Sequence, residues 1–195
     1  NADYLLENVA GQWSFASEPL IRIGETLGAG SLLATDFDHD GDVDLLVATR
    51  AGLRLLRNDG LEEDKGMLVD ATDGTGLPPG TWLATSEDLD GDNDVDYLLT
   101  TPGGGPVALA SNERGGRFSD ATQQLPPELA GRWVVPADFD GDGRTDLAVF
   151  AADLTLHTRH AGGGWHSEPR RFTLAEAPSG PPQAIDLDLD GACDL

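Results

Sequence analysis

The chain has 195 residues, 39% of them hydrophobic, and a net charge of −23. It is long and apolar enough to bury a core, which argues against general disorder. The acidic balance excludes a nucleic-acid-binding face, because no basic surface exists to displace counterions from phosphates. No apolar run approaches the roughly 20 residues that cross a bilayer, so we expect no direct membrane insertion.

The negative charge is concentrated in four windows of nine residues, 36–44, 88–96, 138–146 and 186–194. These windows hold 18 of the 25 aspartates and one arginine, Arg144, and therefore carry −17 of the net charge. An acidic run is usually a solvated face or a disordered tail. Here the aspartates alternate with other residues, surround a glycine or asparagine, and adjoin an apolar segment. This arrangement indicates that the negative charge is balanced by a bound partner.

The expected elements repeat along the chain. Residues 1–24 read as a partial unit, with a strand at DYLLENV and another at GQWSFAS. Residues 30–72 contain four expected strands, SLLATD, DLLVATR, GLRLLRND and GMLVDAT, with an acidic loop after the first. The same order recurs in 81–122 and 132–173, and 181–195 begins a further unit. The acidic loops start at Asp36, Asp88, Asp138 and Asp186, so the period is near 50 residues.

Four short antiparallel strands in a repeat of this length predict an all-β fold built of propeller blades. The register contains 15 expected strands, which amounts to about four blades in a single β-propeller segment covering 1–195. We expect this segment to belong to a larger propeller, for example one of seven blades. A four-bladed ring that lacks one strand is the alternative.

The aspartate spacing predicts calcium sites. Calcium takes six to eight oxygen ligands, and a loop with carboxylates at positions 1, 3 and 5 and a backbone carbonyl at position 7 supplies them. Position 6 is glycine or Asn93, both tolerant of a left-handed backbone. The fourth loop lacks its closing strand and is the least complete of the four. The predicted metal residues are Asp36, Asp38, Asp40, Asp42 and Asp44; Asp88, Asp90, Asp92, Asp94 and Asp96; Asp138, Asp140, Asp142, Arg144 and Asp146; and Asp186, Asp188, Asp190, Ala192 and Asp194.

An EF-hand is excluded, because position 12 is Val47, Leu99 or Val149 rather than glutamate. The pattern D-x-D-x-D-G-x-x-D followed by LLVA or LAVF resembles the FG-GAP or VCBS-type repeat. That family builds the calcium-bound β-propellers of integrin α subunits and of many bacterial secreted proteins. The resemblance implies structural calcium in a hairpin at the periphery of each blade. It does not select a function, because the family serves adhesion, ligand binding and sometimes carbohydrate processing.

Other chemistry-bearing residues have simpler interpretations. His157, His160 and His166 lack a carboxylate or cysteine that would complete a metal site, and His39 is expected to be exposed. Trp13, Trp82, Trp133 and Trp165 recur at fixed offsets, as packing residues do. Cys193 is expected to be a buried, inert thiol. The sequence has no nucleophile elbow, phosphate-binding loop or His-Glu-x-x-His motif, so we predict no catalytic residues and no enzyme activity.

These observations predict a calcium-stabilised, non-enzymatic propeller scaffold that binds a protein or glycan, as in adhesion. Its contacts are expected from turns on one rim, such as 101–106 or 160–166. Millimolar calcium outside cells suits such sites, so we expect an extracellular, periplasmic or cell-surface location. One alternative is part of a secreted polysaccharide lyase or hydrolase. Another is a structural subunit within a larger chain or extracellular assembly.

Overall fold

The computed structural model describes residues 6–15, 31–49, 51–59, 68–80, 82–166, 169–176 and 178–195. In these residues every regular element is a strand, apart from one 3-10 turn at Thr122–Gln124. β1 (Leu6–Val9) and β2 (Gln12–Phe15) form a two-stranded hairpin. The rest of the predicted unit 1–24 lies outside the described residues.

Three four-stranded antiparallel sheets follow, each with its strands in chain order. They confirm the prediction of an all-β chain built of four-stranded blades. The first sheet contains β3 (Ser31–Thr35), β4 (Asp44–Thr49), β5 (Gly52–Asn58) and β6 (Leu68–Asp70). The second contains β7 (Leu83–Glu87), β8 (Asp96–Thr100), β9 (Ala108–Asn112) and β10 (Phe118–Asp120). The third contains β11 (Trp133–Ala137), β12 (Asp146–Phe150), β13 (Leu154–His157) and β14 (Arg170–Phe172).

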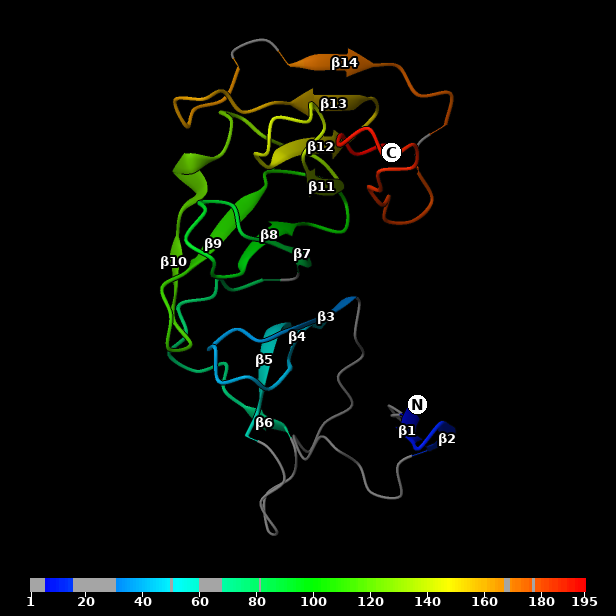
Figure 1. Ribbon diagram of the computed structural model, residues 1–195. Coiled ribbons are helices and arrows are strands. Elements are labelled where there is room, and N and C mark those ends of the chain that lie inside the picture. Colours follow the sequence, from blue (N-terminus) through cyan, green and yellow to red (C-terminus); the bar gives the residue numbers. More distant parts are fainter. Residues whose placement is uncertain are drawn as a thin grey trace.

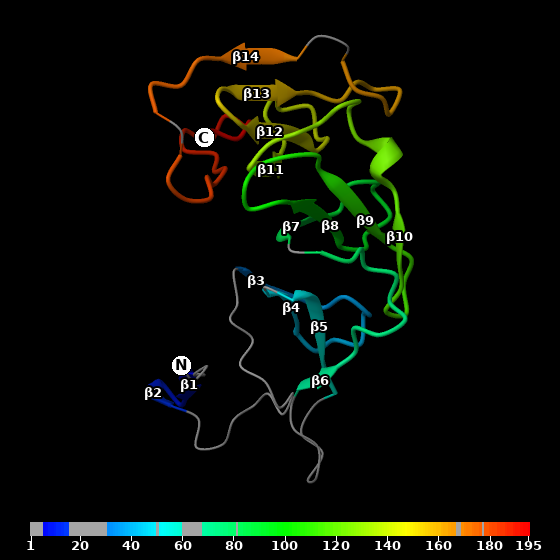
Figure 2. The ribbon, with the colours of Figure 1, turned by 180° about the vertical axis from the view of Figure 1, so that it is seen from behind.

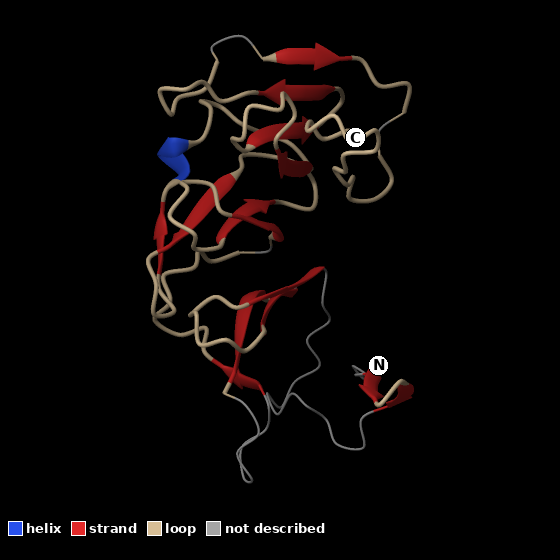
Figure 3. Cartoon of the chain, viewed as in Figure 1, coloured by secondary structure: helices blue, strands red, loops and turns tan. Residues whose placement is uncertain are grey.

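The three sheets follow one another along an arc (Figures 1 and 2). Their first strands, β3, β7 and β11, lie on the inner side of this arc, and β3 contacts β7, which in turn contacts β11. The last strands, β6, β10 and β14, lie on the outside. Figure 3 shows that the described connections between strands are loops, apart from the 3-10 turn between β10 and β11. This is the arrangement of consecutive propeller blades. Whether further blades complete a ring stays a prediction.

The hydrophobic core lies between neighbouring sheets. One cluster joins the first and second sheets and includes Phe37, Leu55, Tyr97 and Phe118. A second cluster joins the second and third sheets through residues such as Leu89 and Leu147. The second strands β8 and β12 are buried along their whole length, since a neighbour covers both faces. Burial between sheets therefore fixes their relative positions.

Tryptophan packing agrees with the sequence-based interpretation. Trp82, Trp133 and Trp165 are each half-buried against one of the core clusters. Trp165 Nε1 also donates to the carbonyl of Gln124 at 2.7 Å, and the Arg159 guanidinium lies 4.8 Å from its ring centroid. Trp13 belongs to β2, where side chains are outside the described part.

Candidate metal centres

Each of the first three acidic loops joins the first strand of a sheet to the second. The loops 36–43, 88–95 and 138–145 connect β3 to β4, β7 to β8 and β11 to β12. Connections alternate between the two ends of an antiparallel meander, so these loops share one end of their sheets. The fourth loop is closed by an antiparallel bridge between Ile185 and Asp194.

The aspartate at position 9 closes each loop by accepting a hydrogen bond from the backbone N–H at position 2. Asp44 is fully buried, and its two carboxylate oxygens accept backbone N–H groups from Phe37 at 3.1 Å and Asn58 at 2.7 Å. One bond holds the loop and the other holds the end of the third strand. Asp96 accepts from Leu89 and Asn112 in the same way, Asp146 from Phe139 and Arg159, and Asp194 from Leu187.

This hydrogen bond involves residues at the end of the third strand that the sequence analysis did not single out. The asparagines that end the third strand, Asn58 and Asn112, supply the backbone N–H, and Arg159 supplies it in the third sheet. Their recurrence in step with the acidic loops was the available signal. The hydrogen bond to the position-9 aspartate comes from the backbone N–H, so arginine can replace asparagine here and keep this bond.

In each loop, aspartate side chains accept hydrogen bonds from the backbone N–H groups of the same loop. At position 1, Asp138 accepts N–H bonds from Gly141, Asp142 and Gly143 at 2.7–3.1 Å. Positions 4 and 6 have positive φ angles in all four loops, including non-glycine residues that adopt this backbone less readily. These residues are His39 (φ 62°), Asn93 (68°) and Leu189 (62°). The prediction that Asn93 takes a left-handed conformation is confirmed.

This loop conformation brings the aspartate carboxylates close to one another. In every loop, oxygens from three aspartates lie within 4.8 Å of one another. These sets contain positions 1 and 3 together with position 5 or 9, so the structure assembles much of the predicted donor set. The sets are Asp36, Asp38 and Asp40; Asp88, Asp90 and Asp96; Asp138, Asp140 and Asp146; and Asp186, Asp188 and Asp194.

The first loop gives the clearest test of fit to a cation. Asp36 Oδ1 and Asp38 Oδ1 are buried and have no hydrogen-bond partner among the described residues. A buried acceptor without a partner costs free energy that a bound cation would offset. All donors are oxygens, the ligands of a hard cation such as calcium. The residues present therefore fit the predicted ion.

Burial and mutual repulsion raise the pKa of several loop carboxyls. Burial raises the pKa of Asp44 from 3.8 to about 6, and hydrogen bonds from Asn58 and Phe37 oppose this rise. The pKa values of Asp96 and Asp146 are raised for the same reason. Burial and the neighbouring Asp40 also raise the pKa of Asp38. These carboxylates lie where ionisation is costly without a counter-charge.

The side chains at position 7, where only the backbone carbonyl was predicted to bind calcium, differ between the loops. Asp42 is exposed and Asp94 is buried, with a side-chain exposure of 1%. Arg114 Nε donates to Asp94 Oδ2 at 2.6 Å, and His39 Nε2 lies 2.7 Å from Oδ1. Asp94 therefore binds neighbouring side chains and is absent from the cluster of its own loop. That the backbone oxygens at position 7 bind an ion stays a prediction.

The first two acidic loops are also joined to the next sheet, and the third is joined to the fourth acidic loop. The Phe37 carbonyl accepts from Asn112 Nδ2 at 2.8 Å, and the Leu89 carbonyl accepts from Arg159 Nη1. In the third loop, the Asp138 carbonyl accepts from the backbone of Cys193 at 2.7 Å. The loops thus contribute to the joints between blades.

Cys193 is half-buried rather than buried, and burial raises the pKa of its thiol. The corresponding residue of the first loop, Val43, is 56% exposed. His160 and His166 form an edge-to-face pair with ring centroids 5.6 Å apart. Among the described residues, no histidine joins a potential metal cluster.

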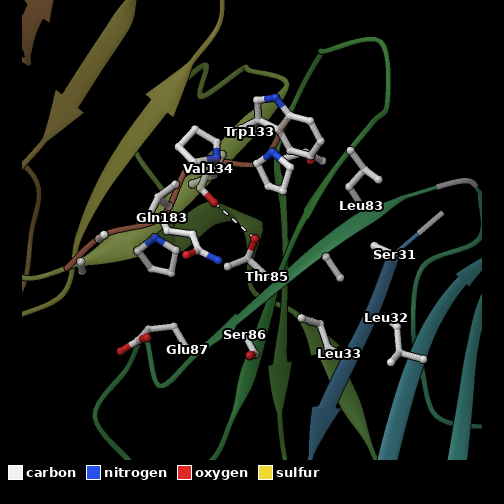
Figure 4. A pocket seen from close by; sticks show the side chains of 18 residues that line it. Ser31, Leu32, Leu33, Leu83, Thr85, Ser86, Glu87, Trp133, Val134 and Gln183 are labelled. Atoms are coloured by element: carbon white, nitrogen blue, oxygen red, sulfur yellow. Dashed lines mark hydrogen bonds between the residues drawn. The ribbon is translucent and has the colours of Figure 1, made fainter. Parts of the chain in front are cut away.

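A pocket of about 640 Å³ lies on the inner side of the arc, lined by β3, β7, β11 and residues 181–184. Figure 4 shows Thr85 bonded to Val134 O across two of these strands. Glu87 is the one charged side chain among the lining residues; burial raises its pKa, and Thr145 Oγ1 lies 3.3 Å from its carboxyl.

The two turns expected to offer partner contacts do not share a rim. Residues 101–107 join β8 to β9, whereas 158–169 join β13 to β14. In an antiparallel meander these connections fall at opposite ends of the sheets, and only the second shares the end of the acidic loops. The expectation that both turns belong to one rim is therefore wrong.

Comparison with known families supports the interpretation of the loops. Residues 88–149, which contain the second and third acidic loops, match the family model described as an FG-GAP-like repeat. This confirms the resemblance predicted from the loop pattern. No curated protein matches the chain. In the described residues, no helix is long and apolar enough to span a membrane.

Proposed function

We propose that the chain is a calcium-stabilised β-propeller scaffold without enzymatic activity, which binds a protein or a glycan. The observation that carries the calcium assignment is the pair of buried, unpartnered oxygens, Asp36 Oδ1 and Asp38 Oδ1, in the first loop. The same arrangement of carboxylates recurs at the same end of each sheet. A solvated acidic turn would leave these oxygens in water.

The proposed mechanism is electrostatic. The carboxylates of each loop lie close together and repel one another, and this repulsion destabilises the folded loop. When bound, a calcium ion supplies the positive charge that offsets this repulsion. Four divalent ions would bring the net charge from −23 to −15. The position-9 aspartates then transmit the order of the loop to the strands through their backbone hydrogen bonds.

A scaffold is favoured over the enzyme alternative by the chemistry of the concave sites. The inner pocket offers a single carboxyl group, Glu87. In the part of the chain that the structure describes, the carboxylate clusters belong to the acidic loops, where a bound cation would keep them ionised and unsuited to donate protons. The proposed location is extracellular, periplasmic or on the cell surface, where calcium is abundant enough to fill such loops.

The calcium assignment is tested by calorimetric titration of chelator-stripped protein, with thermal melts in parallel. We expect three or four calcium ions to bind. Calcium at about 100 times the dissociation constant adds about 2.7 kcal/mol per independent site, which raises Tm by roughly 5–10 °C for a chain of this size. Magnesium at equal concentration serves as the comparison ion.

Two matched variants separate ligation from general loss of charge. Asp38→Asn and Asp42→Asn each remove one negative charge from the same loop. Only Asp38 has a buried oxygen directed away from any protein partner, whereas Asp42 is exposed. We expect Asp38→Asn to abolish or strongly weaken one site and Asp42→Asn to leave the stoichiometry unchanged. Equal effects of the two variants, or no calcium heat at all, would refute calcium ligation.

The scaffold role is tested separately, with calcium-loaded protein against a glycan array and a polysaccharide degradation panel. Retention of a glycan class without turnover supports the scaffold. Turnover that a single substitution at Glu87 abolishes would replace it with the enzyme alternative.

A further inference from the structure

We propose that the Asp94 carboxylate couples cation binding in the first acidic loop to cation binding in the second. This proposal rests on the calcium binding proposed above and adds a relation between two of its sites. It assigns the Asp94 side chain a positioning role rather than that of a ligand.

Asp94 is a junction between three segments. Its side chain is buried in a loop whose preceding four residues are exposed. Arg114, in the turn between β9 and β10, donates to one carboxylate oxygen at 2.6 Å. His39 Nε2, from the acidic loop of the preceding sheet, lies 2.7 Å from the other oxygen. One buried carboxylate thus joins the first loop, the second loop and a turn.

The same turn holds both loops through further bonds. Arg114 Nη2 donates to the carbonyl of Asp92 in the second loop at 3.2 Å. Asn112 Oδ1 accepts from the Arg114 backbone at 3.0 Å, and Asn112 Nδ2 donates to the carbonyl of Phe37 in the first loop. The contact between His39 and Asp94 is therefore one of several that join the two loops and this turn, and it is the one between side chains of the two loops.

The position of His39 explains why binding should be coupled. It lies between Asp38 and Asp40, two members of the first carboxylate cluster. A cation held by that cluster fixes the backbone on both sides of His39 and thereby holds its ring against Asp94. The backbone of Asp94 supplies the predicted carbonyl ligand of the second loop. Order gained in one loop then reduces the entropy lost on binding in the other, which gives positive cooperativity.

The neighbouring pair of loops is an internal control. The residues that correspond to His39 and Asp94 there are Gly91 and Arg144, and glycine has no side chain to make the contact. In the described residues, the salt bridge of Arg144 is to Asp142 in its own loop. The second and third loops should therefore bind with little of this coupling.

The test uses the full chain labelled with 15N-glycine and titrated with calcium. The N–H groups of Gly41, Gly91 and Gly143 each donate to the position-1 aspartate of their own loop, so their amide resonances report the three loops separately. Asp38→Asn disables the first loop. We expect it to weaken the calcium response at Gly91 by about fivefold or more and to leave Gly143 within about twofold.

His39→Asn removes the link, because asparagine tolerates the left-handed backbone but is too short to reach Asp94. In this background we expect Asp38→Asn to change the Gly91 response by less than about twofold. His39→Asn alone, a change at an exposed residue, should shift the Gly91 midpoint to higher calcium. The effect must also be reciprocal, so disabling the second loop with Asp90→Asn should weaken the response at Gly41 by the same factor.

The outcomes separate this proposal from the one on which it rests. Calcium responses at Gly41 and Gly91 that are independent, or equally coupled with and without His39, overturn the coupling and leave calcium binding in place. A loss at Gly143 as large as that at Gly91 also overturns it, because it indicates general unfolding. No response at any of the three glycines overturns both proposals.

Discussion

Asn112 donates a hydrogen bond from Nδ2 to the backbone carbonyl of Phe37, 75 residues earlier in the chain, at 2.8 Å. Both residues are buried, and the bond joins the third strand of one sheet to the acidic loop of the preceding sheet. The conformation of the loop and the packing of the sheets are therefore parts of one structure.

Asn112→Ala is expected to lower the free energy of unfolding by about 1–3 kcal/mol, because it leaves the buried Phe37 carbonyl without this donor. Urea denaturation monitored by circular dichroism measures the change. Gln123→Ala, at an exposed position, is the control and should stay within about 0.5 kcal/mol. Equal values for the two variants would show that the bond between sheets does not contribute to stability.

Phe37→Ala and Leu187→Ala compare the same loop position in two environments. Phe37 is 1% exposed, with its ring centroid 6.4 Å from that of Phe118, whereas Leu187 is 72% exposed. We expect the first change to cost about 3–5 kcal/mol and the second less than about 0.5 kcal/mol. Urea midpoints of the two variants provide the measurement. A large loss for Leu187→Ala would mean that this residue is buried in solution.

Gly76→Ala and Gly74→Ala separate steric overlap from backbone strain. Both glycines have similar positive φ angles, 84° and 80°. A Cβ at Gly76 would overlap the carbonyl oxygen of Phe118, whereas a Cβ at Gly74 meets nothing within 4 Å. We therefore expect Gly76→Ala to be less stable than Gly74→Ala by about 1–3 kcal/mol in thermal or urea unfolding. Similar stabilities would indicate that the segment around Gly76 does not lie against Phe118 of β10.

The calcium-free protein is expected to become more stable as the pH falls from 7.5 toward 5. The pKa of Asp44 is about 6 in the folded state against an ordinary value of 3.8. The folded state thus binds more protons between these values, so the contribution is present at low pH and is lost as pH rises through 6. Asp96 and Asp146, with raised pKa values, act in the same direction.

Thermal melts in chelator at pH 5 and pH 7.5 measure this effect, and we expect Tm to be higher at pH 5 by at least about 2 °C. In excess calcium the trend should reverse, because protons then compete with the ion for the carboxylates. A calcium-free Tm that rises steadily with pH would contradict the prediction.

The repeat, the strands and the acidic loops were predictable from sequence because each depends on local pattern. Alternation of aspartates places their side chains around one loop, and the apolar run that follows is long enough for one buried strand. The left-handed backbone at Asn93 was predicted from residue type alone. His39 and Leu189 adopt it without a comparable signal, because the loop hydrogen bonds determine their conformation.

The contacts between sheets were beyond sequence analysis. Asp94 and Asp42 hold equivalent positions, yet one is buried and the other exposed. The difference arises from Arg114, 20 residues away, and from His39 in another blade. No local pattern encodes such partners. For the same reason, the two glycine-rich turns were assigned to one rim although the strand order places them at opposite ends.

The bonds from the first two acidic loops to the following sheets make the chain a linear series of nearest-neighbour units. In such a series, stability propagates from unit to unit, and damage at one joint fades with distance along the array. Under the proposed calcium binding, loss of a single ion would then loosen the adjoining blade and spare those farther away. Amide exchange should accordingly report a gradient of opening along the chain rather than one global event.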